Sequence, residues 1–176
     1  MGISGYMYRS AVLYYDHETE TFWEQMSGRG VIGPLTGKRL KWLPIEITTW
    51  GEWKKKHRNT TVLKPVFTGH RYRAMNRAYR RYRDGGRRRY PIHVEVDPTY
   101  KEMERVIIVD RGKGARCYPF KELSKGVTED GGLRLTRTGD SVVVTTGDGK
   151  RVAHMTGFWF AWCAYYPKGT VYKRTR

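Results

Sequence analysis

Residues 158–165 read Phe-Trp-Phe-Ala-Trp-Cys-Ala-Tyr, a run with no charged side chain. On a helical wheel this run leaves almost no polar face, which is typical of a helix that other elements surround. Trp159 and Trp162 would lie about one turn apart, and we interpret them as core anchors rather than ligand contacts. The sequence therefore predicts a short buried helix late in the chain.

The same tryptophan spacing occurs earlier, at Trp50 and Trp53, which we also interpret as core anchors, and it lies within a longer matching pattern. Trp-x-x-Trp followed by Thr-Val-x-Lys occupies residues 50–64 and again residues 159–173, an offset of 109. We interpret the chain as one domain, residues 1–176, that contains an approximate internal repeat. The two copies are predicted at residues 1–66 and 104–176, joined by a basic connecting segment at 67–103.

Short apolar and β-branched runs bounded by turn signals predict strands through most of the remaining chain. Gly147-Asp148-Gly149 is the strongest turn signal and predicts a hairpin. The expected fold class is mainly β (α+β), with two β-rich units that each end in a short tryptophan-anchored helix. Strands are expected at residues 6–15, 21–23, 106–109, 115–118, 141–146 and 150–153.

Two further short helices are expected from capping signals. Thr48 or Thr49 can cap a helix that carries Trp50 and Trp53 and ends in lysines. Proline suits the first turn of a helix, so residues 119–123 are expected to form the other.

Residues 71–89 read RYRAMNRAYRRYRDGGRRR, with nine arginines and one aspartate. On a helical wheel the apolar and aromatic side chains share an arc of roughly 140°, and the arginines occupy the other side. Asp84-Gly85-Gly86 should end this amphipathic helix. Solvated helix faces usually mix both charges, whereas this face has no acid before its end. We therefore expect it to meet a polyanion, although a face that only aids solubility is the simpler alternative.

The whole chain is strongly basic, with a net charge of +17 over 176 residues. Such a charge points to nucleic acid, an anionic surface or a strongly acidic protein as the partner. The arginine-rich segment and a lysine cluster are the predicted contacts with a polyanion. They comprise Arg71, Arg73, Arg77, Arg80, Arg81, Arg83, Arg87, Arg88, Arg89, Lys54, Lys55 and Lys56.

The residues show no catalytic, metal or cofactor motif, and none is predicted. Histidines and cysteines lack the spacing of zinc ligands, and Cys117 and Cys163 are expected to be buried thiols. Thr68, His70 and Arg71 form a possible site for a small anionic ligand, because Arg71 would depress the pKa of the neighbouring imidazole. The alternative is that His70 holds its loop through a backbone hydrogen bond.

Six short motifs occupy residues 33–40, 47–53, 68–71, 104–106, 115–119 and 158–162. Together they resemble the prokaryotic domain-of-unknown-function family 3179. The resemblance implies an architecture and no established activity. Family members carry an upstream segment with a Cys-Pro-x-Cys motif, which these 176 residues do not contain. No metal or redox role of those cysteines can therefore be transferred to this chain. The arginine segment replaces a loop rich in glycine, aspartate and tyrosine, and so looks like an addition to an older scaffold.

Three functions are consistent with these features. The first is a non-enzymatic module that presents the arginine-rich helix to RNA, DNA or a nucleoprotein assembly. The second is a structural subunit that docks on an acidic protein, with Met75, Tyr79 and Tyr82 packed against the scaffold. The third is an enzyme or ligand-binding domain at residues 68–71. No secretory signal or membrane span is visible, so a cytoplasmic location is expected; the alternative is an extracytoplasmic location, if the chain is a processed fragment. The oligomeric state stays open.

Overall fold

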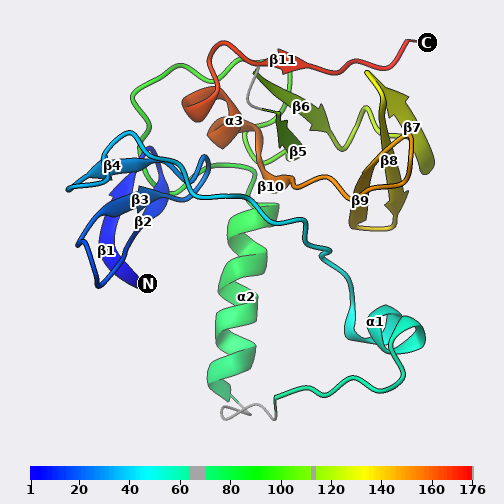
Figure 1. Cartoon of the computed structure of the whole chain (residues 1–176), viewed down its shortest axis with the longest axis horizontal. Coiled ribbons are helices and arrows are strands. Elements are labelled where there is room, and N and C mark those ends of the chain that lie inside the picture. Colours follow the sequence, from blue (N-terminus) through cyan, green and yellow to red (C-terminus); the bar gives the residue numbers. More distant parts are fainter. Residues whose placement is uncertain (64–69, 112–113, 176) are drawn as a thin grey trace.

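Three β-sheets and three helices make up the part of the chain that the computed structural model describes (Figure 1). That part comprises residues 1–63, 70–111 and 114–175, without the side chains of residues 70–72 and 75. The mainly β prediction is confirmed. The helices are α1 (Trp50–Lys56), α2 (His70–Asp84) and α3 (Trp159–Tyr165).

The strands form one N-terminal, one central and one three-stranded sheet. The N-terminal sheet has the order β1 (Gly2–Tyr8), β2 (Ala11–Tyr15), β3 (Phe22–Glu24), β4 (Gly30–Ile32). The central sheet has the order β10 (Met155–Phe158), β5 (Arg105–Asp110), β6 (Ala115–Pro119), β11 (Thr170–Val171), in which β11 runs parallel to β6. The third sheet has the order β7 (Gly126–Asp130), β8 (Leu133–Thr138), β9 (Ser141–Thr146).

Strand β5 is buried on both faces, and its side chains alternate between two apolar clusters. Val106 and Ile108 belong to the cluster around α3, whereas Ile107 and Val109 belong to the cluster shared with the third sheet. All four are at most 1% exposed. A strand covered on both faces is expected to be continuously apolar, which explains the Val-Ile-Ile-Val sequence.

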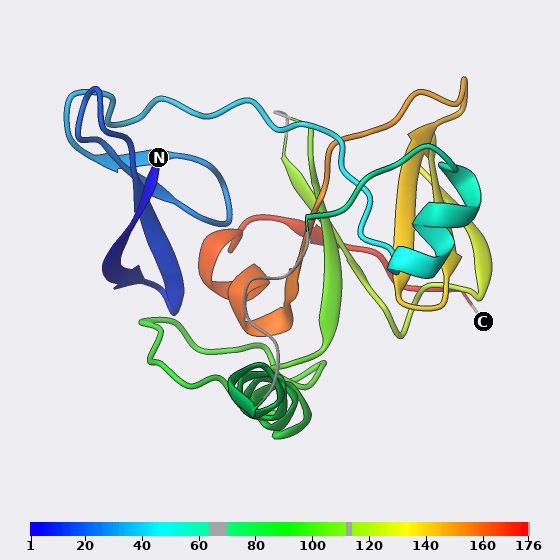
Figure 2. The same ribbon diagram turned by 90° about the horizontal axis from the view of Figure 1, so that it is seen from below.

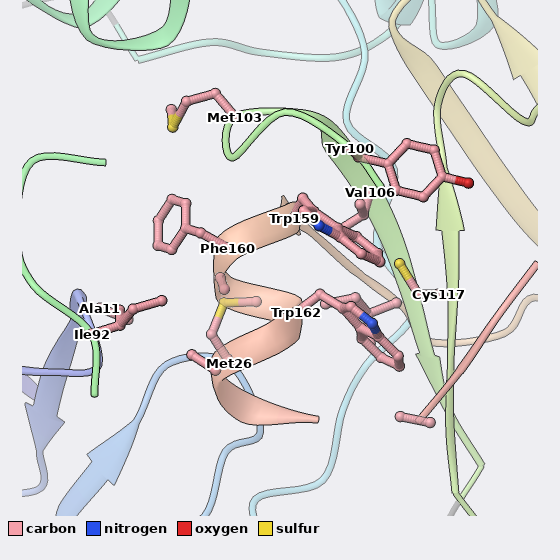
Figure 3. Close-up of a cluster of buried hydrophobic side chains, with 14 residues drawn as sticks. Ala11, Met26, Ile92, Tyr100, Met103, Val106, Cys117, Trp159, Phe160 and Trp162 are labelled. Carbon is pink, nitrogen blue, oxygen red and sulfur yellow. The ribbon is translucent and has the colours of Figure 1, made fainter. Parts of the chain in front are cut away.

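Helix α3 fills the space between the central and N-terminal sheets (Figures 2 and 3). The rings of Trp159 and Trp162 are only 2% and 3% exposed. Phe158 provides no side-chain cap, so backbone carbonyls satisfy the first amides instead. The Trp159 amide donates to the Glu104 carbonyl at 2.8 Å, and the Phe160 amide donates to the Glu102 carbonyl at 3.1 Å.

The N-terminal sheet is attached to α3 through a two-residue turn. Residues 6–15, predicted as one extended run, are divided between β1 and β2, because Arg9 and Ser10 turn the chain with φ of 48° and 62°. The Arg9 guanidinium donates to the Ala164 carbonyl at 2.5 Å. The Tyr165 hydroxyl donates to the Tyr8 carbonyl, also at 2.5 Å. These contacts hold left-handed backbone that non-glycine residues rarely adopt.

The interpretation of Trp50 and Trp53 as core anchors is wrong, unlike that of the later pair. Trp50 is 46% exposed and α1 has no buried residue. Trp53 stacks on His57 with the ring centroids 3.9 Å apart and donates to the Thr60 hydroxyl at 3.1 Å. Irregular chain precedes α1 while β10 precedes α3, so the internal repeat gains no support from the fold.

Two local predictions also differ from the structure. Residues 119–123 do not form a helix: Pro119 ends β6 and a turn follows it, since the Phe120 amide donates back to the Arg105 carbonyl at 2.9 Å and keeps the chain on the sheet. Residues 150–153 form an isolated bridge, Thr145–Arg151, rather than a named strand, because the main partner of β9 is β8. The predicted hairpin across Gly147-Asp148-Gly149 is nevertheless present, since the Thr146 amide donates to the Lys150 carbonyl and the Val152 amide donates to the Val144 carbonyl, both at 2.9 Å.

Gly169 is predicted to be required for the packing of α3. A Cβ atom added there would lie 2.1 Å from Cη2 of Trp162 and 3.1 Å from the Ala115 carbonyl oxygen. Because both neighbours are fixed in the core, Gly169→Ala should lower the free energy of unfolding by about 1–3 kcal/mol in urea titrations. Gly147→Ala is the control, since its Cβ would meet nothing within 4 Å. Equal stability of the two variants would contradict this packing.

Candidate functional site

Helix α2 projects from the body of the protein, and its N-terminal end lies farthest from the sheets (Figure 1). Tyr82, in the last turn, is half-buried and packs against the cluster around α3. The other described side chains of α2 are exposed. Gly86, with φ of +71°, follows the helix in the left-handed conformation typical of a helix end.

Four arginines on α2 have no carboxylate partner among the residues that the structure describes. These are Arg73, Arg77, Arg80 and Arg81, all of them exposed. Arg83 lies 3.3 Å from the carboxylate of Asp84, but both groups are exposed and such pairs contribute little. The helix therefore carries positive charge that its own described surroundings do not neutralise.

The apolar side of α2 is largely exposed as well. Tyr79 is 67% exposed, and Ala74 and Ala78 are also exposed. The expectation that this face packs against the scaffold is correct for Tyr82 and wrong for Tyr79, because the helix meets the body only in its last turn. The Met75 side chain lies outside the described part of the chain.

The arginines that follow α2 differ in their surroundings. Both the guanidinium and the backbone amide of Arg88 donate to the Glu102 carboxylate, the latter at 3.1 Å. Arg89 lies 5.8 Å from the centre of the Tyr82 ring, within the range of a cation–π contact. The Glu102 carbonyl also accepts a hydrogen bond from the Phe160 amide. Arg88 therefore links the C-terminal end of α2 to the start of α3 through Glu102. Arg87 stays exposed beside them.

The lysine cluster lies on α1, which Thr49 caps by accepting from the Glu52 amide at 3.3 Å. Lys55 pairs with Glu52 at 2.9 Å within the helix. Lys54 is exposed and has no ion pair among the described residues. Sequence reasoning missed Arg58, which lines an open depression of about 560 Å³ beside this cluster.

Glu46 ties α1 to the rest of the protein. Its carboxylate is 5% exposed and accepts from Lys56 at 2.9 Å and from Arg151 at 3.0 Å. The hydrogen bond from Lys56 holds the pKa of Glu46 below its usual range, and Arg151 acts in the same direction. No motif pointed to Glu46, since its partners lie 10 and 105 residues away.

The structure separates the predicted contact residues into free and engaged groups. Thr68 and the side chains of His70 and Arg71 lie outside the described residues, so the possible ligand site is not described. The engaged side chains contact acids or a ring: Arg83, Arg88, Arg89, Lys55 and Lys56. Those without an ion pair in the described chain are Arg73, Arg77, Arg80, Arg81, Arg87 and Lys54.

The described residues contain no group of three potential metal-binding side chains. Cys117 is buried and Cys163 half-buried, and both are free thiols. Burial raises the pKa of Cys117, so its thiol is protonated at neutral pH. No helix in the described part of the chain is long and apolar enough to span a bilayer.

Fold and surface together define a mainly β protein with a projecting basic helix. The chain belongs to the family described as Protein of unknown function (DUF3179), whose model matches residues 1–146. The resemblance inferred from the sequence motifs is therefore confirmed, although the motif at 158–162 lies beyond the matched residues. Comparisons with curated proteins and with solved structures gave no match.

Glu46→Gln is predicted to loosen α1, because a neutral amide cannot form both ion pairs of the carboxylate. Hydrogen exchange of the α1 amides at neutral pH should accelerate relative to the wild type. Glu52→Gln is the matched control, since it removes only the exposed Lys55 pair within the helix. Because the pKa of Glu46 is lowered, its contribution is present at neutral pH and should be lost as the pH falls below the ordinary value of about 4.3. Equal exchange in both variants would contradict the role of Glu46.

Proposed function

We propose that the protein is a non-enzymatic binding module that presents α2 to a nucleic acid in the cytoplasm. The observation that supports this most is the set of exposed arginines on α2 without ion pairs in the described chain. Arginine stays charged at physiological pH, so adjacent guanidinium groups repel one another. A polyanion laid along the helix would remove that repulsion.

The dimensions of α2 suit a nucleic-acid backbone. From Arg73 to Arg81 the helix rises about 12 Å, and an α-helix fits the major groove of a DNA duplex. Arginine binds phosphate oxygens in a bidentate manner, which fixes position without reading the base. We therefore expect tight binding at low salt with little preference for sequence. In this proposal α2 is an addition to a duplicated β-rich scaffold, as the motif pattern predicts.

An acidic protein is the second candidate partner, and the exposed side of α2 favours it. Ala74, Ala78 and Tyr79 would stay solvated on a phosphate backbone, whereas a protein groove could cover them. An enzyme or small-ligand site at Thr68, His70 and Arg71 is the third, and it rests on residues whose side chains the structure does not describe.

Replacing Arg73, Arg77, Arg80 and Arg81 by glutamine should reduce binding to nucleic acid uniformly across sequences. Fluorescence anisotropy with a labelled DNA duplex and a labelled RNA hairpin measures the affinity. For the wild type, contact with about six to eight phosphates predicts a loss of about 10³-fold or more in affinity between about 50 and 200 mM salt. In the variant the slope of log K against log salt should fall by about 3 to 4, because four phosphate contacts are removed.

The control removes the same charge from exposed residues elsewhere: Arg29, Lys121, Lys125 and Arg134, each replaced by glutamine. An equal loss in this control would show that only net charge matters and that α2 is not the site. A wild-type protein that binds neither probe at low salt, but purifies in stoichiometric amounts with an acidic protein, would refute the nucleic-acid function and favour the second candidate.

A further inference from the structure

Residues 38–63, here called the arm, expose an unusual amount of apolar side chain. The arm leaves the N-terminal sheet as extended chain, includes α1 and returns toward the N-terminal end of α2 (Figures 1 and 2). Six of its large apolar residues are between 46% and 94% exposed. They are Leu43, Ile45, Ile47, Trp50, Val62 and Leu63.

The extended part of the arm turns its aliphatic residues outward, whereas Trp42, Glu46 and Thr48 are half-buried. Leu43, Ile45 and Ile47 are exposed, whereas Glu46 between them is held inward by its ion pairs with Lys56 and Arg151. An extended segment of a soluble protein normally has the opposite orientation, with aliphatic side chains on the core face. Because the two ion pairs of the buried Glu46 carboxylate fix this orientation, the aliphatic face can be covered only from outside.

The arm is also basic. It contains seven lysines and arginines and two glutamates. Both glutamates are already neutralised, Glu46 by Lys56 and Arg151 and Glu52 by Lys55. Lys54, on the same short helix as Trp50, and Arg58, in the chain that follows this helix, remain exposed. The surface therefore combines aliphatic groups, one tryptophan and excess positive charge.

We propose that the arm docks on an anionic lipid surface. Its aliphatic side chains would enter the boundary between headgroups and acyl chains, Trp50 would lie at the interface, and the lysines would meet lipid phosphates. A nucleic acid fits the arm poorly, because leucine, isoleucine and valine neither stack on bases nor bind phosphate. Stable membrane binding by a surface segment needs two weak signals together, insertion of apolar groups and attraction of basic groups to anionic lipids. The arm supplies both.

The arrangement of the basic elements agrees with docking on one side. Helix α1, residues 57–63 and the N-terminal end of α2 lie on the same side of the protein, the lower side of Figure 1 and the near side of Figure 2. A membrane on that side would meet α1, residues 57–63 and the arginines near the projecting end of α2 together. This proposal goes beyond nucleic-acid binding and does not require it.

Flotation with vesicles tests the proposal directly. The full chain should float with vesicles of phosphatidylcholine mixed with phosphatidylglycerol, and should not float with phosphatidylcholine alone. The variant Ile45→Ser, Ile47→Ser, Leu63→Ser keeps every charge and should lose about tenfold or more in vesicle affinity, because it removes apolar groups that enter the bilayer. The matched control is Ile3→Ser, Ile32→Ser, Val127→Ser, whose residues are similarly exposed on other elements and which should bind like the wild type.

The same variants separate this proposal from the proposed function. The arm variant should retain wild-type affinity for the DNA duplex, whatever the outcome of the arginine substitutions on α2. Absence of wild-type flotation, or vesicle binding that both serine variants leave unchanged, would refute lipid docking. Concentration-dependent self-association in sedimentation that only the arm variant abolishes, without vesicle binding, would identify a second copy of the chain as the occupant and refute it too.

Discussion

The double-sided burial of β5 is the constraint on which the rest of the structure depends. Its alternate side chains enter two separate apolar clusters, so this one strand joins the layer around α3 to the third sheet. Any shift of β5 by one residue would exchange the two sets of side chains, and each would meet the wrong layer. The register of the central sheet is therefore fixed from both sides, and the basic elements are attached to a rigid support.

Sequence reasoning identified the parts of the fold in which the adjacent residues in the sequence determine whether a side chain is buried. A strand with the sequence Val-Ile-Ile-Val must be buried on both faces. The helix around Trp159 has no polar side to expose to solvent. Trp50 shows the limit of this logic. Its motif matches that of Trp159, but the lysines that follow it cannot be enclosed, so the same spacing produces an exposed helix. Strands β7 and β8 were not predicted, because β7 buries Thr128 while exposing Val127, and β8 has only two apolar residues, both leucines.

The sequence predicted which segment carries the candidate site, but not which of its arginines lack a carboxylate partner. The density of arginine in residues 71–89 is visible in the sequence, and so is the end of the helix. Whether a given arginine is available depends on acids elsewhere in the chain. Arg87 and Arg88 are neighbours with the same chemistry, yet only Arg88 meets Glu102, which the fold of the central sheet brings close. The outward aliphatic face of the arm likewise depends on the distant pair between Glu46 and Arg151.

The order of the central sheet, in which β10 and β11 flank β5 and β6, has a consequence for biosynthesis. A ribosome makes β5 well before it makes α3, so the nascent chain carries the apolar side of that strand uncovered in the meantime. Contacts between segments so distant in sequence also form slowly, because a long loop must close first. Newly made chains should therefore pass through a stage that is prone to aggregation and is suited to capture by chaperones. The mature molecule, with the same strand enclosed, gives no sign of that vulnerability.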